Sequence, residues 1–258
     1  LEAAALGPHD AVLEVGPGLG VLTTELVRRA GRVVAVEVDH RLAGWLRERL
    51  AGVAHFALIE DDILRVDPGA LMGEGPYQVV ANLPYAITSP VLRHLLEAQP
   101  PPARLVVMVQ WEVARRITAA PPEMSLLALA VQYYGRPEIV ARVPAGCFFP
   151  APQVDSAVLR IEVAPQPRVD VPPQAFFHLA RLAFAHPRQQ LGKTLAAGLG
   201  RAREEVAAAL EAAGLDPHRR PQTVALEEWG SLWKHLKSGL PRLEHVTTTE
   251  TQKAQRKP

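Results

Sequence analysis

The 258-residue sequence contains a single cysteine, Cys147, which excludes an internal disulfide and any zinc site built on several cysteines. We interpret Cys147 as a packing residue. No apolar run is long enough for a membrane-spanning helix, and the first residues lack the pattern of a secretory signal peptide. The histidines show no metal-ligand spacing, and no G-x-S-x-G hydrolase elbow occurs. We therefore expect a cytoplasmic protein that binds neither membrane nor metal.

Lysine is missing from the first 164 residues, and the charge is unevenly divided although the net charge is only +1. Residues 1–164 carry 14 Arg against 18 acids, a net charge of −4. Residues 165–258 carry 14 Lys plus Arg against 9 acids, a net charge of +5. A basic C-terminal part indicates contact with nucleic acid. A solvated helical surface explains these charges equally well, so charge alone leaves both interpretations open.

Short apolar runs alternate with amphipathic segments through the first two thirds of the chain. The pattern predicts strands at residues 11–15, 33–36, 53–59, 77–81 and 105–109 and helices at 21–30, 41–50, 88–98 and 111–118. This alternation predicts an α/β fold with a doubly wound, mostly parallel sheet. Residues 125–134 fit a helix or a strand, and residues 139–143 and 157–163 are β-like.

Prolines near residue 165 indicate a linker, and helical periodicity dominates the chain beyond it. Helices are expected at 174–185, 189–198, 204–213 and 226–236. We therefore expect an α/β domain over residues 1–164 and a small all-α domain over residues 165–245. Residues 246–258 are rich in Thr, Gln and Lys and are predicted to form a disordered tail.

A glycine turn follows the first predicted strand. Gly16, Gly18 and Gly20 allow the backbone to approach a ligand without Cβ clashes. The spacing is not the G-x-G-x-x-G of dinucleotide folds, and Pro17 removes a backbone donor. With Glu14 just before it, the turn is more typical of an S-adenosylmethionine site than of a phosphate site.

Acidic residues follow the next two predicted strands, at the edge where ligands bind in such sheets. Glu37, followed by Val38, can accept hydrogen bonds from both ribose hydroxyls of an adenosine ligand. Asp62 can accept one from the adenine amino group, with Ile63 packing on the ring. Each acid taken singly is equally well an ordinary surface residue, but together they favour adenosine binding.

The segment Asn82-Leu83-Pro84-Tyr85 ends the fourth predicted strand in a stiff turn, because Pro84 keeps Leu83 extended. The Asn82 side-chain oxygen and the Pro84 carbonyl can accept hydrogen bonds from an exocyclic amine and aim its lone pair at a methyl group. Tyr85 can stack on a flipped base, and Phe148 in the Pro-rich segment 148–156 can hold its opposite face. The alternative is a strand-ending turn with two core aromatics.

With these motifs the sequence resembles the rRNA adenine N6,N6-dimethyltransferases, especially the bacterial KsgA type, over nearly the whole chain. The resemblance implies a Rossmann-like methyltransferase domain, S-adenosyl-L-methionine as cofactor, and a small-subunit partner. The implied reaction dimethylates two adjacent adenines near the 3′ end of 16S rRNA and serves small-subunit maturation. We expect a monomer. The implied cofactor contacts are Glu14, Gly16, Gly18, Gly20, Glu37, Val38, Asp62, Ile63 and Asn82, and the implied catalytic residues are Asn82, Leu83, Pro84, Tyr85 and Phe148.

Other functions stay open at this stage. One is a 23S rRNA adenine N6-methyltransferase of the antibiotic-resistance type. Another is a non-catalytic ribosome-assembly or transcription factor on the same scaffold. A dinucleotide oxidoreductase is disfavoured, because its third glycine is not at the required spacing.

Overall fold

The computed structural model describes residues 1–237, which fall into two compact units. The first unit consists of residues 1–119 and 127–168, and the second of residues 120–126 with the chain from Val169 onward. The first unit extends past the expected boundary because the backbone N–H of Arg168 donates to the carbonyl of Tyr133 at 2.9 Å. The expected tail at 246–258 lies outside the described residues.

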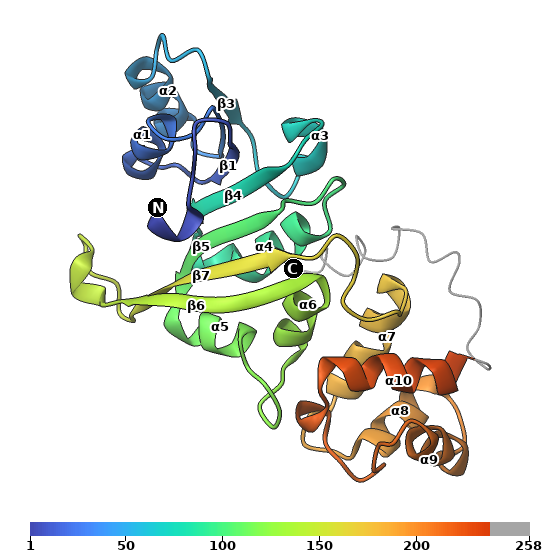
Figure 1. The fold of residues 1–258 in the computed structure, drawn as a ribbon. Coiled ribbons are helices and arrows are strands. Elements are labelled where there is room, and N and C mark those ends of the chain that lie inside the picture. The colour runs from blue at the N-terminus through green and yellow to red at the C-terminus, as the bar shows by residue number, and fades with distance from the viewer. Residues whose placement is uncertain (238–258) are drawn as a thin grey trace. The chain divides into compact units, whose positions relative to one another are not determined.

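The first unit is built on a seven-stranded sheet in the order β3-β2-β1-β4-β5-β7-β6 (Figure 1). The strands are β1 (Ala11–Val15), β2 (Arg32–Glu37), β3 (Phe56–Glu60), β4 (Tyr77–Asn82), β5 (Arg104–Gln110), β6 (Gly135–Val143) and β7 (Ser156–Val163). The first five strands are parallel to one another, whereas β7 is antiparallel to both β5 and β6. The predicted doubly wound, mostly parallel sheet is confirmed.

The central strands β1, β2, β4 and β5 are largely buried on both faces, as parallel sheets require, whereas the edge strands β3 and β6 are more exposed. Successive strand residues point to opposite faces, so Leu13 and Val15 of β1 pack in one cluster and Val12 packs in another. The first cluster includes residues of α3 (Pro68–Met72), α4 (Thr88–Leu96), α5 (Trp111–Ile117) and α6 (Leu126–Tyr134). The second includes η1 (Glu2–Ala4) and α1 (Val21–Val27).

The order of connections reverses between β1 and β4. The chain passes from β1 through α1 to β2 on one side, and then through α2 (His40–Arg49), β3 and α3 back to β4 on the other. Ligands bind in such sheets where the order reverses, beyond the carboxyl ends of the strands. The Gly16 turn and Asn82 follow the two strands at this point, so the fold brings these predicted features together.

The second unit contains α7 (Pro173–Phe184), α8 (Leu191–Leu199), α9 (Arg203–Ala212), η4 (Pro221–Thr223) and α10 (Leu226–Leu236). Phe176 of α7 and Trp229 of α10 are both buried, with ring centroids 6.4 Å apart. The segment 120–126 also packs here, because the Met124 N–H donates to the Gln222 carbonyl at 3.0 Å. The sequence did not indicate that this segment belongs to the helical unit.

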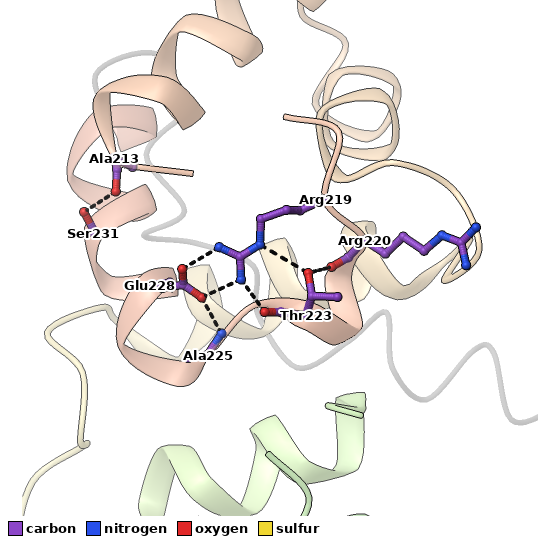
Figure 2. Close-up of polar contacts among 7 residues, drawn as sticks. All are labelled: Ala213, Arg219, Arg220, Thr223, Ala225, Glu228 and Ser231. Carbon is purple, nitrogen blue, oxygen red and sulfur yellow. Dashed lines mark hydrogen bonds and ion pairs between the residues drawn. The ribbon is translucent and has the colours of Figure 1, made fainter. Parts of the chain in front are cut away.

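Figure 2 shows the polar contacts that fix the start of α10. The Arg219 guanidinium donates to both carboxylate oxygens of Glu228, at 2.6 and 3.0 Å, and also to the Thr223 hydroxyl and carbonyl. Glu228 in turn accepts the backbone N–H of Ala225 at 2.6 Å. Burial opposes the Glu228 charge, but these donors outweigh it and hold the pKa of its carboxyl below the ordinary value. The pair therefore caps the helix and joins it to the preceding loop.

Most differences from the predicted elements concern their ends. The predicted strand at 53–59 is β3 at 56–60, and the helix at 21–30 ends at Val27. The ambiguous segment 125–134 is the helix α6. The helix α3 was missed, although Asp67 marks its start by accepting the N–H groups of Gly69 and Ala70.

Candidate active site

The glycine turn joins β1 to α1 and has a backbone that other residues adopt only with strain. Gly16, Gly18 and Gly20 have φ angles of 65°, 57° and 75°. A Cβ on Gly20 would lie 2.5 Å from Cδ2 of Leu46 in α2, so this position has no room for a side chain. A Cβ on Gly18 would meet nothing within 4 Å. The turn is therefore packed at its helix end and open in the middle.

Glu37, the last residue of β2, connects this turn to the neighbouring strand. Its Oε2 accepts the N–H of Gly18 and its Oε1 accepts the N–H of Asp39, both at 3.0 Å. A carboxylate has about four acceptor positions, so each oxygen keeps capacity for a ligand donor. Val38 beside it is 72% exposed, which places an apolar surface next to a fixed carboxylate.

Glu14 of β1 is the more deeply buried of the two buried acids Glu14 and Glu37, with 1% of its surface exposed. Its Oε2 has no hydrogen-bond partner among the described residues. Burial raises the pKa of Glu14 to about 7, and the charge of Glu37 adds to this effect, while the nearby Thr23 hydroxyl opposes it. A buried oxygen without a partner costs free energy, so it is a natural acceptor for a donor supplied by a ligand.

Asp62 and Ile63 follow the end of β3. Oδ1 of Asp62 accepts the N–H of Leu64 at 3.0 Å and so shapes the loop after the strand. Ile63 is buried and belongs to the core cluster, so its side chain offers little surface to a ring. The cofactor contacts of both residues stay predictions, and any contact from Ile63 has to come mainly from its backbone.

The turn after β4 exposes Asn82 and Pro84 and buries Leu83. Leu83 anchors the turn, because its side chain lies in the core and its N–H donates to the Met108 carbonyl at 3.1 Å. The Pro84 carbonyl already accepts two hydrogen bonds, from the N–H of Ile87 and the hydroxyl of Thr88, each at 3.2 Å. Both of its lone pairs are therefore engaged in this conformation, whereas the Asn82 side-chain oxygen has no hydrogen bond to another residue of the described range.

The glycine turn and this second turn lie against each other. A Cβ built on Gly16 would be 3.9 Å from Cγ and Cδ of the Pro84 ring. A ligand held by the glycine turn therefore lies beside Asn82. This proximity joins two motifs that are far apart in the sequence.

Tyr85 is fixed by its hydroxyl group, which hydrogen-bonds to the Ser156 hydroxyl at 2.7 Å. Phe148 follows the short turn η3 (Ala145–Cys147) and is half-buried. Within the described residues the two rings do not contact each other, and the base clamp stays a prediction. Cys147 is exposed, so its interpretation as a packing residue is wrong. It lies in a short turn of a loop, where little surrounds its side chain.

Phe149 is a side chain whose importance the sequence reasoning missed. It is fully exposed next to Phe148, which is unusual for a large apolar residue. The two adjacent phenylalanines were visible in the sequence, but no local pattern indicated which of them faces solvent. The contact between Trp111 and Arg142 was also missed, because these residues are distant in the chain.

Two further properties of residues 1–237 bear on function. None of the helices has the length and apolar character that crossing a membrane requires. The second unit has a cavity of about 440 Å³ to which His186, Lys193, Arg201 and Arg203 contribute, and none of its lining residues is acidic. Such a surface attracts anions.

The sheet topology and the polar features at its edge define a Rossmann-like methyltransferase. The chain belongs to the ribosomal RNA adenine dimethylase family, whose model matches residues 1–237. It is 49% identical over 235 residues to ribosomal RNA small subunit methyltransferase A from Dehalococcoides mccartyi strain BAV1, covering 90% of this chain and 80% of that protein. It is 43% identical over 246 residues to the protein of the same name from Moorella thermoacetica, covering 91% and 85%.

Solved structures agree with this assignment. The structure of the 23S rRNA methyltransferase ErmE has a TM-score of 0.72 and 32% identity, covering 92% of this chain and 94% of that one. A dimethyladenosine transferase from Plasmodium falciparum has a TM-score of 0.78 and 22% identity, covering 92% and 93%, which supports the fold. The predicted enzyme class, an rRNA adenine dimethyltransferase, is confirmed.

Proposed function

We propose that this enzyme transfers methyl groups from S-adenosyl-L-methionine to the N6 amines of two adjacent adenines near the 3′ end of 16S rRNA. The observation that carries the proposal is the proximity of the Gly16 turn to Pro84. Methyl transfer requires a donor and an acceptor held within reach of each other, and these two turns are suited to hold them.

The residues at the edge of the sheet fit an adenosine-bearing cofactor. Glu37 is anchored by two backbone N–H groups and keeps acceptor capacity for ribose hydroxyls. Val38 offers an apolar face for the adenine ring, and Asp62 lies at the next strand end as an acceptor for its amino group. The unpartnered oxygen of Glu14 suits a donor group of the cofactor. When bound, the cofactor supplies an electrophilic methyl group.

Asn82 aims the acceptor amine in this proposal. Its side-chain oxygen accepts an N–H of the adenine amine, which favours a localised lone pair directed at the methyl carbon. The bound cofactor would supply the methyl group to this nitrogen, and the nitrogen would then release its extra proton to solvent. The Pro84 carbonyl contributes only if the Thr88 hydroxyl turns away from it. Tyr85, fixed by Ser156, and Phe148 stack on the two faces of the extruded base.

Two observations support 16S rRNA as the substrate: the sequence identity to small-subunit methyltransferases and the basic cavity of the helical unit. The small-subunit methyltransferases above are 49% and 43% identical to the chain, compared with 32% for ErmE. The basic cavity of the helical unit is suited to RNA phosphates, which supports an RNA-contacting role for this unit. We further propose that the enzyme acts as a monomer in the cytoplasm during small-subunit maturation and needs no metal.

The test is to incubate the protein with S-adenosyl-L-methionine and under-methylated small subunits, and then to map dimethyladenosine by mass spectrometry of the digested rRNA. We expect two adjacent dimethyladenosines near the 3′ end of 16S rRNA. Modification of 23S rRNA instead would support the antibiotic-resistance type of activity. Cofactor binding without methylation of either RNA would support a non-catalytic assembly role.

A further inference from the structure

A second concave site lies in the first unit, beyond the end of β5. Its volume is about 320 Å³, and its lining residues are Gln110, Trp111, Glu112, Arg142, Val154 and Asp155. This volume is at the lower end of the range of small-ligand pockets. The residues come from the end of β5, the start of α5, the end of β6 and the segment before β7. None of them belongs to the cofactor or acceptor residues assigned above.

The walls of this cavity are held in place by contacts within the chain. The Arg142 guanidinium lies over the Trp111 ring, with its carbon 4.9 Å from the ring centroid. Two Arg142 nitrogens contact Oδ2 of Asp155 at 2.8 and 2.7 Å, while Oδ1 accepts the Ala145 N–H at 2.9 Å. The backbone N–H of Trp111 donates to the backbone carbonyl of Asp155 at 2.9 Å. The aromatic and guanidinium groups are therefore ordered before any ligand arrives.

The cavity is one strand away from the acceptor turn. Asn82 of β4 lies opposite Met108 of β5, and Gln110 is two residues further along β5. Typical strand spacing and rise then put the Gln110 and Asn82 Cα atoms roughly 8 Å apart. Ser156, opposite Gln110 on β7, bonds the Tyr85 hydroxyl. An RNA strand with its target adenine at Asn82 can therefore place a neighbouring nucleotide here.

The chemistry of the lining favours a nucleobase over a phosphate. Arg142 is neutralised by Asp155, and Glu112 lies 3.9 Å from Arg115, so the lining has no excess positive charge with which to hold a phosphate. An aromatic ring and a guanidinium plane are the usual stacking partners of unpaired bases. Glu112 and Gln110 supply acceptors for the amino group of adenine, cytosine or guanine, and Val154 provides an apolar wall.

We propose that this cavity, the Trp111 pocket, binds an unpaired, amino-bearing nucleobase adjacent to the target adenine in the substrate RNA. The inference rests on the proposed function and deepens it. The pocket holds the flanking nucleotide while the target base occupies the acceptor turn, and so it helps to select the adenine that is delivered.

The test compares variants in methylation of under-methylated small subunits, with cofactor affinity measured separately by titration. Trp111→Ala is expected to raise the KM for subunits about tenfold, equivalent to about 1.4 kcal/mol, with kcat and cofactor affinity unchanged. Trp111→Phe keeps an aromatic ring that can stack on a base, so its KM for subunits is expected to stay within about threefold of the wild-type value. Complete loss of a stacking contact would raise the KM by more than this.

A second pair of variants tests whether a raised KM in Trp111→Ala reflects lost base binding or only lost packing around Trp111. Val154→Gln fills the cavity and is expected to raise the KM as Trp111→Ala does. Val140→Gln is its matched control, because Val140 is a valine of similar exposure, 41% against 46%, and does not line the cavity. Ultraviolet cross-linking of the wild type should join the Trp111 peptide to the nucleotide next to the methylated adenine.

The outcomes separate this inference from the proposed function. Normal wild-type methylation with unchanged KM in both Trp111→Ala and Val154→Gln refutes the pocket and leaves the proposed function intact. A Trp111 cross-link to a ribosomal protein instead of RNA also refutes it. A wild type that binds the cofactor but methylates no small-subunit adenine refutes the proposed function, and the pocket with it.

Discussion

Replacing Glu14 with glutamine removes a buried acid whose charge the nearby Thr23 hydroxyl compensates only in part, and we expect this change to stabilise the enzyme at pH 8. Glu14 is 1% exposed, and its Oε2 has no partner among the described residues. Glutamine has nearly the same shape and is neutral at every pH. The variant therefore isolates the free energy of holding a charge at this position.

The magnitude follows from the pKa. Burial raises the pKa of Glu14 from 4.5 to about 7, which corresponds to about 3 kcal/mol at 1.36 kcal/mol per pKa unit. The folded carboxyl holds its proton more tightly than the unfolded one, so stability falls as the pH rises from 4.5 to 7. Below pH 4.5 both states are protonated and the two proteins should differ little. Above pH 7 the full difference in unfolding free energy is expected.

Urea unfolding of wild type and Glu14→Gln at pH 4, 6 and 8 measures this difference. Glu48→Gln is the control, because it makes the same chemical change at an exposed position of α2 and should shift stability by less than about 0.5 kcal/mol. Cofactor affinity should fall in Glu14→Gln, because glutamine offers no charge to a ligand donor. Equal stability of the variant and wild type at pH 8, or a difference that does not vary with pH, would refute the reasoning.

The remaining predictions concern the acceptor turn, the glycine turn and the helical unit. Asn82→Ala should lower the single-turnover rate at least about 100-fold, as loss of a positioned polar group does, with an unchanged circular dichroism spectrum. Gly20→Ala should destabilise the protein by about 1–3 kcal/mol in urea unfolding, because the positive φ and the missing space both oppose a Cβ. Replacing Lys193 and Arg203 together by glutamine should reduce the slope of log RNA affinity against log salt by about 1.5, measured by filter binding, with Lys234→Gln as a control outside the cavity.

Each of these predictions has a contradicting result. Near-normal turnover of the Asn82 variant would remove that residue from the mechanism. Wild-type stability of Gly20→Ala would mean that Leu46 of α2 moves away from the new Cβ at little cost in free energy. A loss of salt dependence in Lys234→Gln that equals, per charge removed, the loss in the double variant would show that the cavity has no special role in RNA binding.

The sequence predicted the features that depend on neighbouring residues. Alternating apolar runs predicted the parallel sheet, because strands buried on both faces need continuous apolar segments. The glycines of the turn after β1 predicted a backbone that can approach a ligand without Cβ clashes, and the structure shows that all three have positive φ. The acids at strand ends were predicted to lie at one edge, because the carboxyl ends of parallel strands meet there.

The tertiary structure decided what depends on residues far apart in the chain. It buried Glu14, placed Gly16 against Pro84, stacked Arg142 on Trp111 and grouped residues 120–126 with the helical unit. Burial and long-range contact depend on the whole packed fold, so no local pattern encodes them. The sequence alone thus determined the fold class and the candidate site residues, whereas packing decided which of them lie close together, which is buried with a raised pKa, and which aromatic side chains are exposed.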